Sequence, residues 1–156
     1  MLLIHWTKQN NTNDISKNGI KPTRRKNKNY DKNQLKGIWC FPYTRNKTLN
    51  NNWKSNLKSW RNIKSNFNGF VFKLEEKDFP IYAGDWFSIA QGPNYHKFIC
   101  YSEFIKEYGK YFGDKKMSLD ANEESQIDYQ DFEIIIPNRI EADRIIKVIK
   151  DRIIKK

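Results

Sequence analysis

The clearest strand signal in this chain is Phe132-Glu133-Ile134-Ile135-Ile136-Pro137. Three successive β-branched isoleucines favour a strand, and Pro137 ends it because proline has no backbone N–H to donate. Glu133 opens the apolar run, where a carboxylate is costly to bury unless it lies at an edge or is paired. Two interpretations follow: a charge on a solvent-facing edge strand, or part of a functional site.

Two earlier segments also place polar side chains in or just after apolar, strand-like runs. They read Leu2-Leu3-Ile4-His5-Trp6-Thr7 and Trp39-Cys40-Phe41-Pro42-Tyr43-Thr44-Arg45-Asn46. A lone histidine beside apolar residues is usually a core or surface histidine. One His, one Arg and one Glu on three separate strands instead favour a site made of His5, Arg45 and Glu133.

The remaining pattern predicts short elements around these segments. Strands are expected at residues 2–6, 37–41, 70–74, 97–101 and 132–136, with irregular or short-strand structure at 80–87. Helices are expected from about 12 to Gly19, over 47–62, from Ser102 to Gly113 and over 141–153. The helices are too few for regular βαβ alternation. The expected fold class is therefore α+β: a single domain over residues 1–156, with central antiparallel or mixed sheets flanked by short helices.

The charge of the chain is distributed unevenly. The net charge is +11 over 156 residues, and residues 1–64 hold 15 Lys and Arg but only Asp14 and Asp31 as acids. Residues 65–156 hold 14 basic and 16 acidic side chains. This polarity favours an anionic partner for the N-terminal half, nucleic acid first and a phosphate-bearing small molecule second. A solvated basic surface without a specific partner is the alternative.

The basic residues gather in two stretches. Residues 21–36 are expected to form an exposed, mobile basic loop, and the helix expected over 47–62 carries further cations beside an apolar face of Leu and Trp. That helical spacing favours the core over base stacking for the Trp residues. The candidate nucleic-acid-binding side chains are Arg24, Arg25, Lys26, Lys28, Lys54, Lys58 and Arg61.

The cysteines and the hydropathy of the chain bear on metal binding, membrane insertion and cellular location. Cys40 and Cys100 lie among apolar and aromatic residues and are expected to be buried free thiols. The chain has no CxxC motif or metal-ligand spacing, so no metal site is expected. The first residues do not read as a signal peptide, and no apolar run approaches membrane-spanning length. A cytoplasmic protein with no membrane partner is the default expectation.

The three polar segments, in this order, resemble those of the NAD-dependent ADP-ribosyltransferase superfamily, in its DarT-like and diphtheria-toxin-like branches. His5 followed by Thr7, then Asn18-Gly19-Ile20-Lys21-Pro22, is similar to the first motif of that family. Residues 38–46 resemble its middle strand, and residues 132–140 resemble its catalytic strand. The resemblance covers about half of the chain.

The resemblance implies an NAD site and a reaction. His5, with Thr7, would bind the adenosine-side ribose of NAD, and Tyr43 would stack on nicotinamide. Arg45 would bind the diphosphate or organise the nucleophile. Glu133 would be the catalytic carboxylate, with Asp131 two residues earlier orienting the acceptor, although family members carry Glu or Gln there. Nucleic acid is the expected acceptor, and a role as a toxin or in phage defence rests on this family analogy alone.

Three alternatives use the same residues differently. A non-catalytic nucleic-acid-binding module would use the basic and aromatic residues alone. A degenerate transferase fold would bind NAD or ADP-ribose without turnover, and a partner-binding regulator would use the helix expected over 141–153. An NAD glycohydrolase would share the first chemical step of the transferase.

Two further residues each have two interpretations. His96 is either a general base or an exposed histidine in a loop. Trp86 either lines the nicotinamide pocket or belongs to the core.

Overall fold

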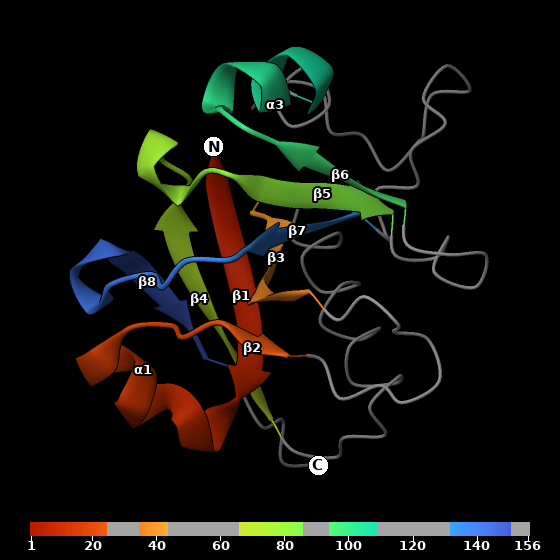
Figure 1. Cartoon of the computed structure of the whole chain (residues 1–156). Helices are drawn as coiled ribbons and strands as arrows, with labels where there is room; N and C mark the ends of the chain where they lie inside the picture. Colours follow the sequence, from red (N-terminus) through yellow and green to blue (C-terminus); the bar gives the residue numbers. More distant parts are fainter. Residues whose placement is uncertain (25–34, 44–65, 86–93, 109–131, 151–156) are drawn as a thin grey trace.

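Antiparallel pairing organises the part of the chain that the structure, a computed structural model, describes: residues 1–24, 35–43, 66–85, 94–108 and 132–150. Eight strands form an antiparallel sheet in an α+β domain, in the order β6-β5-β7-β3-β1-β4-β8, with β2 paired to β3 (Figure 1). The bounds are β1 Leu2–Lys8, β2 Thr23–Arg24, β3 Lys36–Pro42, β4 Phe67–Lys73, β5 Ile81–Asp85, β6 Asn94–Phe98, β7 Phe132–Ile136 and β8 Ile145–Ile149. The described helices are α1 Thr12–Asn18 and α3 Tyr101–Tyr108, with 3-10 turns η1 Gln9–Asn11, η2 Glu76–Asp78 and η4 Ala142–Arg144.

The sheet divides between β1 and β3. β1 pairs with β4 along its whole length, whereas it pairs with β3 only at Leu3↔Pro42 and Ile4↔Phe41. Residues 38–40 of β3 pair instead with β7. We call the point beyond Ile4 and Phe41, where β1 and β3 part, the fork. Figure 1 shows the consequence, since β5 and β6 run across the direction of β1 and β4.

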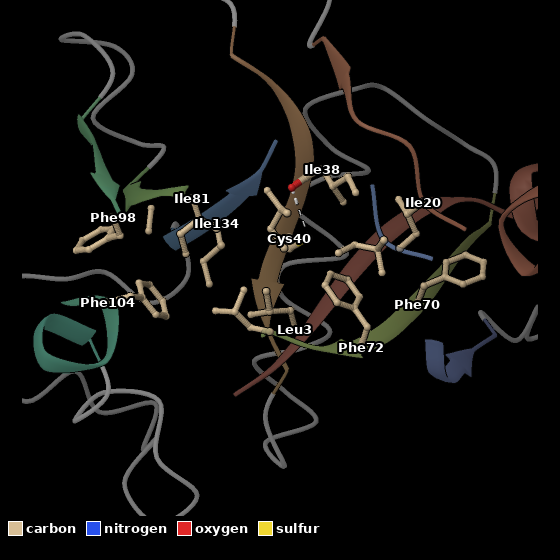
Figure 2. Close-up of a cluster of buried hydrophobic side chains, with 14 of the residues drawn as sticks. Leu3, Ile20, Ile38, Cys40, Phe70, Phe72, Ile81, Phe98, Phe104 and Ile134 are labelled. Carbon is tan, nitrogen blue, oxygen red and sulfur yellow. Dashed lines mark hydrogen bonds between the residues drawn. The ribbon is translucent and has the colours of Figure 1, made fainter. Parts of the chain in front are cut away.

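Two apolar clusters cover the two faces of the sheet. The larger contains Leu3, Cys40 and Ile134 from three strands, together with Phe104 of α3, and Figure 2 shows these side chains gathered on one side. The smaller contains Ile4, Trp6, Phe41, Phe67 and Val71. Side chains alternate between faces along a strand, which is why Leu3 and Ile4 belong to different clusters. The described helices supply residues to the larger cluster.

Several predicted elements are confirmed. The strands expected at 2–6, 37–41, 70–74 and 132–136 all form, with small shifts of their ends. The first helix ends at Gly19, whose φ of +76° is the left-handed conformation that glycine adopts without strain. The Gly19 N–H binds the carbonyl of Ile15, and a Cβ at this position would collide with the backbone of Ile140.

The helix predicted over 141–153 is wrong for the described residues up to 150. A 3-10 turn precedes β8, which pairs with β4 through Val148 and Ile149, opposite Phe70 and Gly69. Val148 packs on the larger cluster and Ile149 on the smaller, so successive side chains serve opposite faces. β-branched residues beside an open sheet edge favour a strand over the amphipathic helix. The partner-binding alternative that used this helix loses its basis.

Of the two alternatives expected for 80–87, the short strand forms, over residues 81–85. Two other boundaries differ from the prediction. β6 begins at Asn94 instead of residue 97. α3 begins at Tyr101, one residue before the expected cap, and the Ser102 hydroxyl instead contacts the Cys100 sulfur at 3.1 Å. Pairing with β5 explains the early start of β6, because Tyr82 and Ala83 lie opposite Lys97 and His96.

The structure describes the two ends of the basic stretch expected over residues 21–36. Thr23 and Arg24 pair with Gly37 and Lys36, so the stretch expected to be a loop begins and ends in strand pairing. Residues 25–34 and the helix expected over 47–62 lie outside the described residues. Within the described residues, no helix is long and apolar enough to cross a membrane.

Candidate functional site

His5 stands at the fork. It is the first residue of β1 beyond the two pairs with β3, and its Nδ1 lies 2.8 Å from the backbone oxygen of Trp39 on β3. A carbonyl oxygen only accepts, so Nδ1 donates and carries the proton. This hydrogen bond fixes the tautomer of a neutral ring, in which Nε2 is the acceptor. The half-buried histidine thus bridges the two strands where their ladder opens.

Glu133 lies inside the sheet, so the edge-strand interpretation is wrong. β7 runs between β5 and β3, and Glu133 is 0% exposed. Ile134 and Ile136 point into the larger cluster, so alternation turns Glu133 to the opposite face, away from the cluster that α1 and α3 complete. The carboxylate is therefore buried on the face of the sheet opposite to the one that α1 and α3 cover.

Tyr95 of β6 supplies a hydrogen bond to this carboxylate. Its hydroxyl donates to Glu133 Oε2 at 3.0 Å, although β5 separates the two strands. The register explains the reach: Gly84 of β5 lies opposite Tyr95 on one side and opposite Glu133 on the other. Because glycine has no side chain, the phenol extends across β5 without meeting one.

Trp39 joins the histidine to the tyrosine. Its carbonyl binds His5, and its ring meets the Tyr95 ring edge-on, with centroids 6.0 Å apart and an interplanar angle of 73°. Such T-shaped pairs are favourable because the positive ring edge meets the negative face. His5, Trp39, Tyr95 and Glu133 thus form a continuous series of contacts from four strands, which we call the fork site.

Sequence reasoning named two members of the fork site and missed the other two. Tyr95 was not a candidate, because only the β5–β6 register shows that it shares a row with Glu133. Trp39 belongs to a segment that was singled out, yet it had no assigned role. Its place between Ile38 and Cys40, both in the larger cluster, was the available signal that it faces the other side.

The remaining predicted NAD-binding residues lie elsewhere or outside the described residues. The Thr7 hydroxyl accepts a hydrogen bond from Asn11 Nδ2 at 2.8 Å, which ties it to the turn before α1. Tyr43 packs against the smaller cluster, and its N–H binds the Leu2 carbonyl at 2.8 Å. Arg45 and Asp131 lie outside the described residues.

Arg24 is the predicted nucleic-acid contact that the structure describes. It is exposed on β2, directly opposite the exposed Lys36 of β3. Like charges in a cross-strand pair repel, and an anion between them relieves that repulsion. Arg25, Lys26, Lys28, Lys54, Lys58 and Arg61 lie outside the described residues, as does Trp86. His96 is exposed on strand β6 rather than in a loop.

A second buried carboxylate has a different setting. Asp78 is 1% exposed and receives two hydrogen bonds from Arg144, one at each carboxylate oxygen and each 2.7 Å long. The hydrogen bond to Asp78 raises the pKa of Arg144. Arg144 also donates to the Lys73 carbonyl at 2.9 Å, so the pair ties η4 to η2 and to the end of β4. We assign Asp78 to the scaffold.

The cysteines are free thiols, as expected, but only Cys40 is buried. Burial, and after it the negative charge of Glu133, raise the pKa of the Cys40 thiol well above its ordinary value. The thiol is therefore neutral at physiological pH and is a poor nucleophile. Cys100 is half-buried beside Ser102, in the turn before α3.

The described residues contain no group of three His, Cys, Asp or Glu side chains that would hold a metal ion. What they assemble is a histidine with a set tautomer and a buried carboxylate, joined through two aromatic residues. The chain matches no protein-family model, no curated protein and no solved structure.

Proposed function

We propose that this protein is an NAD-dependent ADP-ribosyltransferase whose reaction centre is the fork site. The observation that carries the proposal is the series of contacts from His5 through Trp39 and Tyr95 to Glu133, which connects residues of all three polar segments singled out in the sequence. The first and third of these segments come from opposite ends of the sequence, and the contacts begin where β1 and β3 part. The resemblance to the transferase family assigns NAD as the substrate.

Glu133 has the chemical role in this proposal. Its ionised carboxylate accepts a hydrogen bond from a hydroxyl of the nicotinamide ribose as the bond between the anomeric carbon and nicotinamide breaks. Nicotinamide leaves with the bonding electrons, positive charge develops on the ribose ring, and the nearby carboxylate stabilises it. A nucleophilic acceptor then bonds to the anomeric carbon and loses its proton.

The other residues hold NAD in place. His5 binds the adenosine-side ribose, the role that the resemblance implies, and its hydrogen bond to the Trp39 carbonyl holds the ring in place. The resemblance assigns Tyr43 to nicotinamide, Arg45 to the diphosphate and Asp131 to the acceptor. These three assignments rest on the sequence alone.

Nucleic acid is the proposed acceptor. The support within the described residues is the exposed Arg24–Lys36 pair, a point of concentrated positive charge at the base of the basic stretch. Lys and Arg contacts to phosphates would make binding fall with rising salt concentration. The family analogy further suggests a role as a toxin or in phage defence, and the cytoplasm is the proposed location.

A second candidate is an NAD or ADP-ribose sensor without turnover. It is favoured by the complete burial of Glu133, which is 0% exposed. A substrate hydroxyl reaches this carboxylate only when a neighbouring group moves aside. If no such movement occurs, Glu133 is only a structural hydrogen-bond acceptor. The protein then binds NAD or ADP-ribose without turnover.

Release of nicotinamide from NAD tests the proposal. The unmodified chain is compared with Glu133→Ala and with Glu107→Ala, which removes an exposed carboxylate of α3 as the matched control. Each protein is assayed alone and with single-stranded DNA, duplex DNA and RNA. We expect release by the unmodified chain and Glu107→Ala but not by Glu133→Ala, with stimulation by the polymer that is the acceptor.

Other outcomes separate the alternatives. Release that no polymer stimulates indicates a glycohydrolase. No release, but a rise in melting temperature with NAD, indicates the sensor. No release and no rise, with salt-dependent binding to a polymer, indicates the nucleic-acid-binding module.

A further inference from the structure

The row Tyr95–Gly84–Glu133 crosses three adjacent strands. Neighbouring strands lie about 4.8 Å apart, so Tyr95 and Glu133 are separated by roughly twice that distance. The residue between them is glycine, which places no side chain in the path of the phenol. The combination of a phenol, a glycine and a carboxylate in register is what allows the 3.0 Å hydrogen bond.

We propose that Tyr95 is a positioning residue for Glu133 in the reaction proposed above, on which this inference rests. The terminal torsion of a glutamate is broad, so hydrogen bonds to the carboxylate set its orientation. A donor at Oε2 restricts the plane of the carboxylate and with it the direction of Oε1. The hydroxyl of Tyr95 is such a donor.

Trp39 makes this donor rigid. The edge-on contact of the Trp39 and Tyr95 rings restricts rotation of the phenol. The same tryptophan binds His5 through its carbonyl, so the group that orients the carboxylate is connected to the histidine across the fork. Small errors in the placement of a reacting group cost on the order of a hundredfold in rate.

A merely structural hydrogen bond makes a different prediction. In that case Tyr95 only satisfies a buried carboxylate, and loss of its hydroxyl lowers stability without a selective effect on turnover. A positioning role lowers kcat for nicotinamide release and leaves KM for NAD nearly unchanged, because the hydroxyl does not bind the substrate. The ratio of these two effects separates the roles.

The test compares Tyr95→Phe with Tyr101→Phe. Tyr101 is matched, because its ring meets Phe79 edge-on with centroids 6.0 Å apart, and its hydroxyl accepts a 3.0 Å hydrogen bond from the Met1 amino group. Both substitutions keep the ring and remove one hydrogen-bonded hydroxyl. We expect Tyr95→Phe to lower kcat about 10- to 100-fold with KM within about twofold, and Tyr101→Phe to leave both unchanged.

Gly84→Ala provides a second variant, since it keeps both functional groups and places a methyl group between them. We expect kcat to fall in this variant too, with the melting temperature measured to confirm that it folds. Unchanged kcat in Tyr95→Phe, or equal losses in both tyrosine variants, would overturn the positioning role alone. No release by the unmodified chain would instead overturn the proposed function and the positioning role together.

Discussion

The two halves of the sheet each bury a carboxylate, and they treat it differently. Beside β4 and β8, Asp78 receives two hydrogen bonds from Arg144 and one from the backbone N–H of Glu75. In the other half, Glu133 receives a hydrogen bond from the neutral phenol of Tyr95. Both acids are almost completely buried, at 1% and 0% exposed. Burial alone therefore does not separate a structural acid from a candidate catalytic one.

The two carboxylates differ in their hydrogen-bond partners and in their place in the fold. A guanidinium that binds both oxygens neutralises Asp78 and fixes it between η2 and η4. The neutral hydroxyl of Tyr95 donates a hydrogen bond to one oxygen of Glu133. That carboxylate also lies in the fork site, where Tyr95 and Trp39 connect it to His5.

The largest effect is expected at the Asp78–Arg144 pair. Arg144→Met leaves a buried carboxylate without its cation, and we expect the free energy of unfolding to fall by about 3 kcal/mol. Urea unfolding measures the change. Asp78→Asn in the Met background should restore part of the loss, because no buried charge then remains. A loss below about 1 kcal/mol for the single variant would contradict the structural role of the pair.

A smaller effect is expected at Cys40, on alkaline stability. The pKa of this thiol in the folded state is raised above its ordinary value of 9.0. The stability that the neutral thiol contributes is therefore fully present below pH 9.0 and is lost as the pH rises further. We expect Cys40→Ala to reduce the loss of stability between pH 8 and pH 10 by roughly 1 kcal/mol. Unfolding at several pH values measures this slope, with Cys100→Ala as the control. Parallel slopes for Cys40→Ala and the unmodified chain would refute the prediction.

The smallest effect on stability is expected at Glu133. Glu133→Gln keeps the shape of the side chain and an acceptor for the Tyr95 hydroxyl, while it removes a buried charge. We expect the free energy of unfolding to change by less than about 1 kcal/mol. The same variant should lose nicotinamide release, so stability and activity separate at this residue. A loss as large as that of Arg144→Met would place Glu133 in the scaffold with Asp78.

Local pattern was enough to predict β1, β3, β4, β7 and the first helix. Ile134, Ile135 and Ile136 identify a buried strand because β-branched residues in a run have few other places in a fold. Gly19 marks a helix end because its backbone conformation is open to few other residues. The α+β class followed from these elements and their spacing.

Pairing across the sheet was beyond the reach of local pattern. The run at 145–149 has apolar residues at intervals that suit either a helix or a strand, and the open edge of β4 decides between them. The role of Tyr95 depends on a register among three strands, with Gly84 between the phenol and Glu133. The fork between β1 and β3 has no local signature, although His5 at its start was a candidate.

The order of the strands also has a consequence for how the chain folds as it is synthesised. β1 comes first in the chain but is an interior strand, whereas β7, which separates β3 from β5, comes near the end. A nascent chain that has not yet supplied β7 leaves β3 and β5 with open edges, which are prone to pair with other chains. Pairing between strands that are far apart in the sequence is slow to form. We therefore expect the sheet to stay incomplete until β7 has been synthesised, and the chain to require protection from aggregation until then.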